Sequence, residues 1–193
     1  MVAESSGTTG IGVAANATPL NASIERHIPG ADQRIFEFFR AWQAARRGAL
    51  VPMRGNFDPM TVPGLLANMW MYRFEAARGD FVCRLAGEQV NLAWGGSIRG
   101  KTLRQIVGTA NHDLVLQRWK FILRVPLVHY GSAAERLSAQ ETRIAERLLL
   151  PLSSDPDTVD HILGVSFYEL AVVDRSRPPL VPEDIVQFPC AEV

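Results

Sequence analysis

The chain has 193 residues, of which 47% are hydrophobic and 21% charged, so one sizeable core can form without metals or disulfides. Lysine plus arginine number 20, as do aspartate plus glutamate, which removes the usual electrostatic case for nucleic-acid binding. No apolar run approaches the roughly 20 residues that a membrane helix needs. We therefore expect one soluble domain with tails that neither binds nucleic acid nor inserts into a membrane.

The two cysteines, Cys83 and Cys190, lie far apart in the sequence. This usage is typical of free thiols in a reducing compartment and not of a disulfide framework. The N-terminus also lacks the basic stretch and following apolar stretch of a secretion signal. Together these features predict a cytoplasmic protein.

Residues 1–31 are rich in small and polar residues and show no sustained apolar period. Such a segment cannot bury enough apolar surface to offset the entropy lost when it is ordered. We expect a flexible leader there, followed by the domain proper over 32–174. Several prolines beyond Asp174 predict an irregular tail over 175–193.

An amphipathic helix is predicted over 32–47, with Asp32 as its N-cap. Its largest apolar side chains recur at spacings of three and four and form one stripe: Ile35, Phe38, Phe39 and Trp42. A stripe of this size is unusual on the surface of a soluble monomer. Two ways of burying it are open at this point, against the helix's own sheet or against a second copy of the chain.

A proline-rich loop over 49–68 separates this helix from the first predicted hairpin. Strands are expected at 69–75 and 81–86, joined by a short connection that contains Gly79.

Three helices follow the hairpin, at 88–94, 103–107 and 112–125. Thr102 and Gln105 fit a capping box at the start of the second. The third is apolar almost all round, which is typical of a helix buried on more than one side.

Three strands complete the domain, at 132–139, 143–152 and 160–172. Two strands, then helices, then a three-stranded meander indicate one antiparallel sheet with helices gathered on one face. The predicted class is α+β, with five strands and an N-terminal flanking helix.

Three segments of the sequence carry a family resemblance. They are FFRAWQAARRGALVPMRGNFDPMTVPGLLANMWMYRFE, FVCRLAGEQVNLAWGGSIRGKTLRQIV and ERLLLPLSSDPDTVDHILGVSFYE. With the element order, they make residues 36–189 similar to PAS domains, in particular to the compact bacterial family made largely of single-domain proteins.

The resemblance implies a ligand-sensing or protein-interaction module with a pocket between sheet and helices, and it implies no reaction. Flavin-binding light sensors of the superfamily carry a reactive cysteine in the helical region, whereas Cys83 falls in a predicted strand. Haem-binding members use a histidine on the long helix, whereas His112 and His129 lie at its start and beyond its end. We therefore expect no cofactor.

Six residues on the predicted strands and helices are candidates for a ligand pocket: Arg84, Trp94, Trp119, Ile122, Arg147 and Phe167. A guanidinium group facing such a pocket could hold an anionic ligand through paired hydrogen bonds. The competing interpretation places the arginines in cross-strand ion pairs on the solvent face and the apolar residues in the core.

The stretch from Gly95 to Thr102 matches the phosphate-loop spacing GxxxxGK[ST]. A true phosphate loop follows a buried strand and opens a helix, whereas here a predicted helix precedes the stretch. The chain also lacks the alternating strands and helices of a parallel sheet. Two enzymatic alternatives are a nucleotide hydrolase using this loop and a cone-shaped α+β isomerase or hydrolase.

The four histidines are dispersed and show no spacing that would preassemble a metal site. The sequence shows no convincing set of nucleophile and base. It therefore predicts a non-catalytic sensory or regulatory module that binds a small molecule or an unidentified signalling protein. In PAS domains the matching N-terminal helix often mediates dimerisation, so the resemblance favours a homodimer through the stripe from Ile35 to Trp42.

Overall fold

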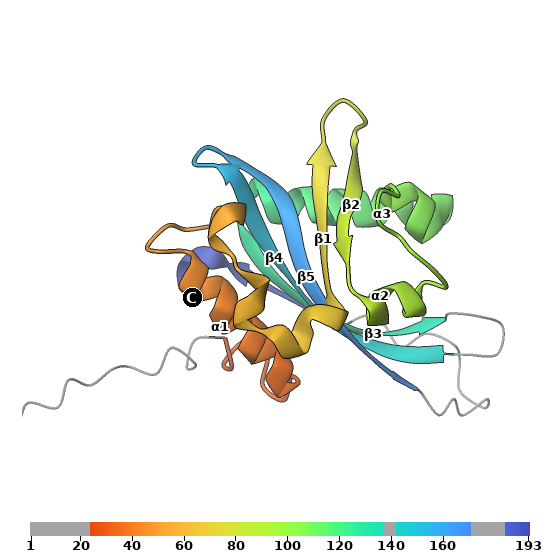
Figure 1. Cartoon of the computed structure of the whole chain (residues 1–193), viewed down its shortest axis with the longest axis horizontal. Coiled ribbons are helices and arrows are strands. Elements are labelled where there is room, and N and C mark those ends of the chain that lie inside the picture. Colours follow the sequence, from red (N-terminus) through yellow and green to blue (C-terminus); the bar gives the residue numbers. More distant parts are fainter. Residues whose placement is uncertain (1–23, 137–141, 171–183) are drawn as a thin grey trace, which may run out of the picture.

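The computed structural model describes residues 24–136, 142–170 and 184–193, which form one antiparallel sheet packed between helical layers (Figure 1). The helices are α1 (Gln33–Ala45), α2 (Glu88–Ala93) and α3 (Leu103–Arg124). The strands are β1 (Met69–Glu75), β2 (Asp80–Ala86), β3 (Leu127–Arg136), β4 (Thr142–Asp155), β5 (Thr158–Leu170) and β6 (Asp184–Pro189). Their order in the sheet is β2-β1-β5-β4-β3-β6. The predicted α+β class and antiparallel sheet are confirmed, with a sixth strand added.

The sixth strand lies in the segment that the sequence predicted to be an irregular tail. β6 pairs antiparallel with β3, from Leu127 opposite Pro189 to Ser132 opposite Asp184. A proline is tolerated here because β6 is an edge strand and Pro189 is its last residue. The tail prediction therefore needs correction over 184–189, while residues 171–183 lie outside the described part of the chain.

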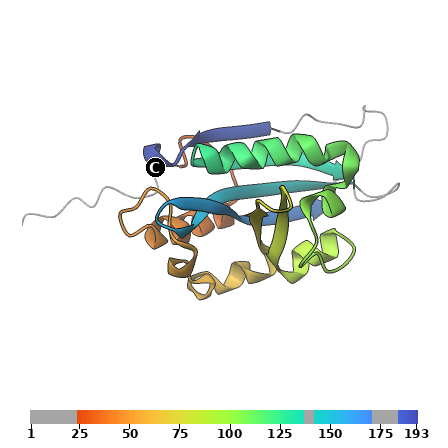
Figure 2. The same ribbon diagram turned by 90° about the horizontal axis from the view of Figure 1, so that it is seen from above.

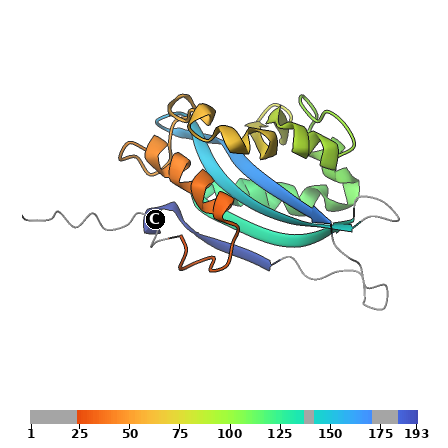
Figure 3. The same ribbon diagram turned by 60° about the horizontal axis from the view of Figure 1, so that its bottom comes forward.

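The flexible leader predicted over residues 1–31 is also too long, because residues 24–31 belong to the folded domain. Ile24, Ile28 and Ala31 are buried in the core, and the His27 ring stacks on Phe188 of β6 with the ring centres 4.0 Å apart. This first described segment runs beside β6 in Figure 3. Ile24 and Ile28 are four residues apart on one turn, so both reach the core. Residues 1–23 lie outside the described part of the chain.

Two apolar layers lie on opposite faces of the sheet, because successive strand residues point to opposite sides. On β1, Met69 and Met71 face the layer of α1, whereas Trp70 and Tyr72 face the layer of α3. Figure 2 shows α3 on one side of the central strands and the turns of 54–68 on the other. Helices therefore cover both faces of the sheet, and not one face as the sequence predicted, because the apolar stripe of the flanking helix α1 is itself buried on the second face.

The apolar stripe of α1 is buried against the chain's own sheet. Ile35, Phe38, Phe39 and Trp42 all have 0% exposure. The indole N–H of Trp42 donates a hydrogen bond of 2.9 Å to the carbonyl oxygen of Pro151 in β4. The expectation that these four residues form a dimer interface is therefore wrong, since one chain covers them completely.

α3 combines two of the predicted helices across a kink at Gly108, whose φ of +76° is outside the helical range. Its predicted capping box is confirmed, because Thr102 and Gln105 each accept the other's backbone N–H. The expectation that the long helix is buried on more than one side is wrong. Leu116, Trp119 and Ile122 face the sheet, but the opposite side is open to solvent.

Candidate functional site

Aromatic side chains fill the layer between α3 and the sheet. Trp119 of α3 stacks on Trp70 of β1, with ring centres 5.5 Å apart and planes at 12°. Tyr72 and Phe81 meet Trp119 edge-on at 5.0 Å and 5.3 Å. All four are buried, so this layer is a packed aromatic cluster.

Two features of β5 hold Trp70 in this cluster. Its indole N–H donates a hydrogen bond of 2.8 Å to the hydroxyl of Ser166. Its ring also lies across Gly164, where a Cβ atom would approach the ring to 2.2 Å. The strand therefore needs glycine at this position for the indole to lie flat on it.

Sequence reasoning missed Trp70, Tyr72, Phe81 and Gly164 as members of this layer. Trp70 and Tyr72 alternate on a predicted strand, which places them on the same face. A glycine inside a strand signals close approach by another group. These two signals together could have located the cluster.

Three of the six predicted pocket residues lie on the α3 side of the sheet. Trp119 and Ile122 belong to the aromatic layer and are buried. Arg147 is half-buried on β4 and shares a face with Leu149, which contacts the same layer. Its charge also acts on the hydroxyl of Tyr72.

The structure does not bring the other three predicted residues to this layer. Phe167 lies on the α1 face, where the guanidinium of Arg34 sits 4.0 Å from its ring centre. Arg84 is exposed on β2 and forms an ion pair with Glu75. Trp94, directly after α2, is 37% exposed. The six residues therefore do not line one common cavity.

The potential nucleophiles buried in the two core layers, Cys83 and Tyr72 on the α3 side and Cys190 on the α1 side, are held in their protonated forms. Burial raises the pKa of the Cys83 thiol to about 11, and that thiol donates to the carbonyl oxygen of Leu85 at 3.3 Å. Burial likewise raises the pKa of the Cys190 thiol to about 12, and it raises the pKa of Tyr72. A protonated thiol is a poor nucleophile, so neither cysteine is prepared for covalent chemistry at neutral pH.

His112 connects the start of β2 to α3. Its Nε2 lies 3.1 Å from Oδ1 of Asp80, and its Nδ1 lies 3.0 Å from Oδ1 of Asp113. Asp80 also accepts the backbone N–H groups of Phe81 and Arg104. Within the ranges that the structure describes, no three His, Cys, Asp or Glu side chains are grouped to hold a metal ion.

The phosphate-loop match lies between α2 and α3. Thr102 is occupied as the N-cap of α3, and the carbonyl oxygen of Lys101 accepts the backbone N–H of Cys83. The stretch therefore follows a short helix and pairs with an edge strand of an antiparallel sheet. The strand–loop–helix context of a phosphate site is absent at this loop.

A second buried histidine, His161, makes the stability of the fold depend on pH. Burial, the largest influence, lowers the pKa of His161 despite the nearby carboxylate of Asp160, whose Oδ1 lies 2.6 Å from Nδ1. Burial alone would raise the pKa of Asp160, but hydrogen bonds from Ser154, His161 and Arg73 outweigh burial and lower it. Both groups therefore favour the folded state more at high pH than at low pH.

We expect the free energy of unfolding to fall as the pH drops below about 6.5, where His161 takes up a proton in the unfolded chain first. The slope from this one group is at most about 1.4 kcal/mol per pH unit. Urea unfolding at pH 7.5 and 5.5 measures the loss, and a His161→Gln variant should lose less than the wild type. Equal losses in the two proteins would show that His161 does not cause the loss of stability at low pH.

Two comparisons relate the chain to known proteins. A family model described as PAS domain matches residues 32–167. Among solved structures, the LOV protein of Rhodobacter sphaeroides is 15% identical, with a TM-score of 0.41, over 75% of this chain and 70% of that chain. The comparison with curated proteins found no match.

Proposed function

The chain belongs to the PAS domain family. We propose that it is a non-catalytic regulatory module, which changes its contacts with another protein when it binds its own ligand or partner. The bound species is a small molecule or a partner protein. The main observation in support of this proposal is the aromatic layer. In it, Trp119 of α3 stacks on Trp70 of β1, and Trp70 donates a hydrogen bond to Ser166 of β5. In a close-packed layer, a displacement of α3 is transmitted to both strands.

Two observations argue against the enzymatic alternatives. The phosphate-loop match joins two helices, and its Thr102 hydroxyl accepts a backbone N–H of α3. The thiols of Cys83 and Cys190 are buried with raised pKa values. Neither feature supplies an activated nucleophile or a phosphate cradle.

A nucleotide titration tests the non-catalytic part of the proposal. We expect no magnesium-dependent binding of ATP or GTP to the full chain, measured by calorimetry, in either the wild type or a Lys101→Ala variant. Lys101 is exposed, so the variant should fold normally. Tight magnesium-dependent binding that disappears in Lys101→Ala would overturn the proposal in favour of a nucleotide hydrolase.

Native mass spectrometry of the purified full chain tests what the module binds. A mass above that of the chain would identify a retained small molecule, for which Trp119, Ile122 and Arg147 are the proposed contacts in the aromatic layer. A mass of two chains would support the homodimer expected from the family, formed through a surface other than the α1 stripe. A bare monomer that also binds no candidate signalling protein would contradict the proposal.

We propose that the module works in the cytoplasm. Cys83 and Cys190 are both free thiols, as is usual in a reducing compartment. In the described part of the chain, no helix has the length and apolar character needed to cross a bilayer.

A further inference from the structure

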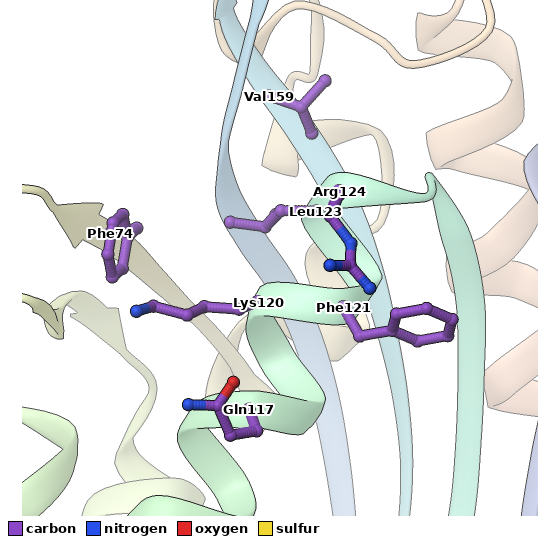
Figure 4. A pocket seen from close by; sticks show the side chains of 7 residues that line it. All are labelled: Phe74, Gln117, Lys120, Phe121, Leu123, Arg124 and Val159. Carbon is purple, nitrogen blue, oxygen red and sulfur yellow. The ribbon is translucent and has the colours of Figure 1, made fainter.

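A groove of about 420 Å³ runs beside the C-terminal half of α3, at the margin of the aromatic layer (Figure 4). Phe74, near the end of β1, and Val159, near the start of β5, line it from the sheet. Leu123 lines it from the helix, and all three side chains are half-buried. The groove is large enough for a small molecule and offers it apolar walls on two sides.

The polar side chains of the groove come from one face of α3. Gln117, Lys120 and Arg124 follow one another at spacings of three and four, so they line up along the helix. In Figure 4, Lys120 extends towards Phe74. The groove therefore combines two cations and an amide with its apolar walls.

The two cationic side chains, Lys120 and Arg124, each contact the face of an aromatic ring. Nζ of Lys120 lies 4.9 Å from the centre of the Phe74 ring, and Cζ of Arg124 lies 5.4 Å from the centre of the Phe121 ring. No ion pair joins Lys120 or Arg124 to an acidic side chain within the described ranges. Like charges four residues apart on a helix repel each other, and an anion bound between them would relieve that repulsion.

The solvent side of α3 is also unusually apolar. Leu114, Phe121 and Val125 are exposed there, at 64%, 39% and 41%. Positive charge at the end of a helix suits the helix dipole, which accounts for a cation at Arg124 alone. The dipole does not account for Phe121, which lines the groove and leaves its ring exposed beside Arg124, whereas a ligand with an apolar body in the groove does.

We propose that this groove binds an amphiphilic anion. The apolar body lies against Phe74, Leu123 and Val159. Its carboxylate, sulfonate or phosphate group lies between Lys120 and Arg124, where the guanidinium can donate paired hydrogen bonds. The site deepens the proposed regulatory function by naming a class of signal, and α3 would carry its occupancy to the aromatic layer through Trp119.

The test is a titration of the full chain, isotopically labelled, with 1-naphthoate, followed by the amide resonances. We expect saturable shifts confined to the groove, around residues 117–124 and at Phe74 and Val159. The neutral analogue 1-naphthalenemethanol should bind at least tenfold more weakly. A Lys120→Gln, Arg124→Gln double variant should also lose at least tenfold in affinity for 1-naphthoate.

Arg104→Gln provides the matched control, since Arg104 is an exposed cation on the same helix and its guanidinium lies 3.8 Å from Asp113. This variant should bind 1-naphthoate like the wild type. Equal binding of the charged and neutral probes, equal losses in both sets of variants, or no saturable shift would overturn the proposal. Such a failure would leave the non-catalytic function intact, because the nucleotide titration depends on Lys101 and not on the groove.

Discussion

Replacing Trp42 with alanine should lower the free energy of unfolding by about 3–5 kcal/mol, the usual cost of emptying a large buried aromatic site. Trp42 is fully buried between α1 and the sheet, and its indole N–H bonds to Pro151. The change leaves a cavity and also removes the donor for a buried carbonyl. Because small domains are stable by only about 5–15 kcal/mol, the variant should be close to unfolding.

Urea unfolding at neutral pH measures this effect, and Arg40→Ala is the control on the same helix. Arg40 is exposed, so its replacement should change the free energy by no more than about 0.5 kcal/mol. A Phe39→Glu, Trp42→Glu double variant, followed by light scattering and circular dichroism, separates the two ways of burying the stripe. We expect this variant to unfold. A variant that stays folded, and whose mass in solution is half that of the wild type, would contradict burial of the stripe within one chain.

Gly87→Ala should destabilise the protein by about 3 kcal/mol, at the upper end of the range for overpacking. Gly87 directly follows β2 and donates its N–H to the carbonyl oxygen of Met69. A Cβ atom there would lie 2.3 Å from the carbonyl oxygen of Leu66 and 2.4 Å from that of Ala67. Both are backbone atoms, so relief requires the turn before β1 to move.

The control for this variant is Gly64→Ala in the same turn, which spans Pro63–Asn68. No atom lies within 4 Å of a Cβ built at Gly64, so we expect a change below about 1 kcal/mol. Thermal unfolding of both variants measures the difference. Equal effects in the two variants would show that the close contact at Gly87 does not cause the loss of stability.

The sequence was sufficient for elements that carry their own signals. The helix α1 has a strong apolar period and a capping aspartate, and Asp32 does accept the backbone N–H of Arg34. β1 begins and ends where its pattern predicted. By contrast, β6 and residues 24–31 are stabilised by partners distant in the sequence, such as Phe188 for His27. Local patterns contain no information on such contacts.

The candidate site was harder to predict because the face of a strand residue depends on register. Phe167 and Ser166 are neighbours, yet Phe167 packs under α1 whereas Ser166 bonds to Trp70 in the layer of α3. A shift of one residue exchanges the two faces. The sequence analysis chose Phe167 as a pocket residue from its type alone, and therefore placed it on the wrong face of the sheet.

The stacked indoles of Trp70 and Trp119 also have an optical consequence. Two parallel rings 5.5 Å apart couple their electronic transitions, and that coupling falls steeply with separation and angle. One ring belongs to the sheet and the other to the helix, whereas Trp42 lies on the far face and Trp94 is partly exposed. The near-ultraviolet circular dichroism of the unlabelled protein should therefore report the distance between α3 and β1.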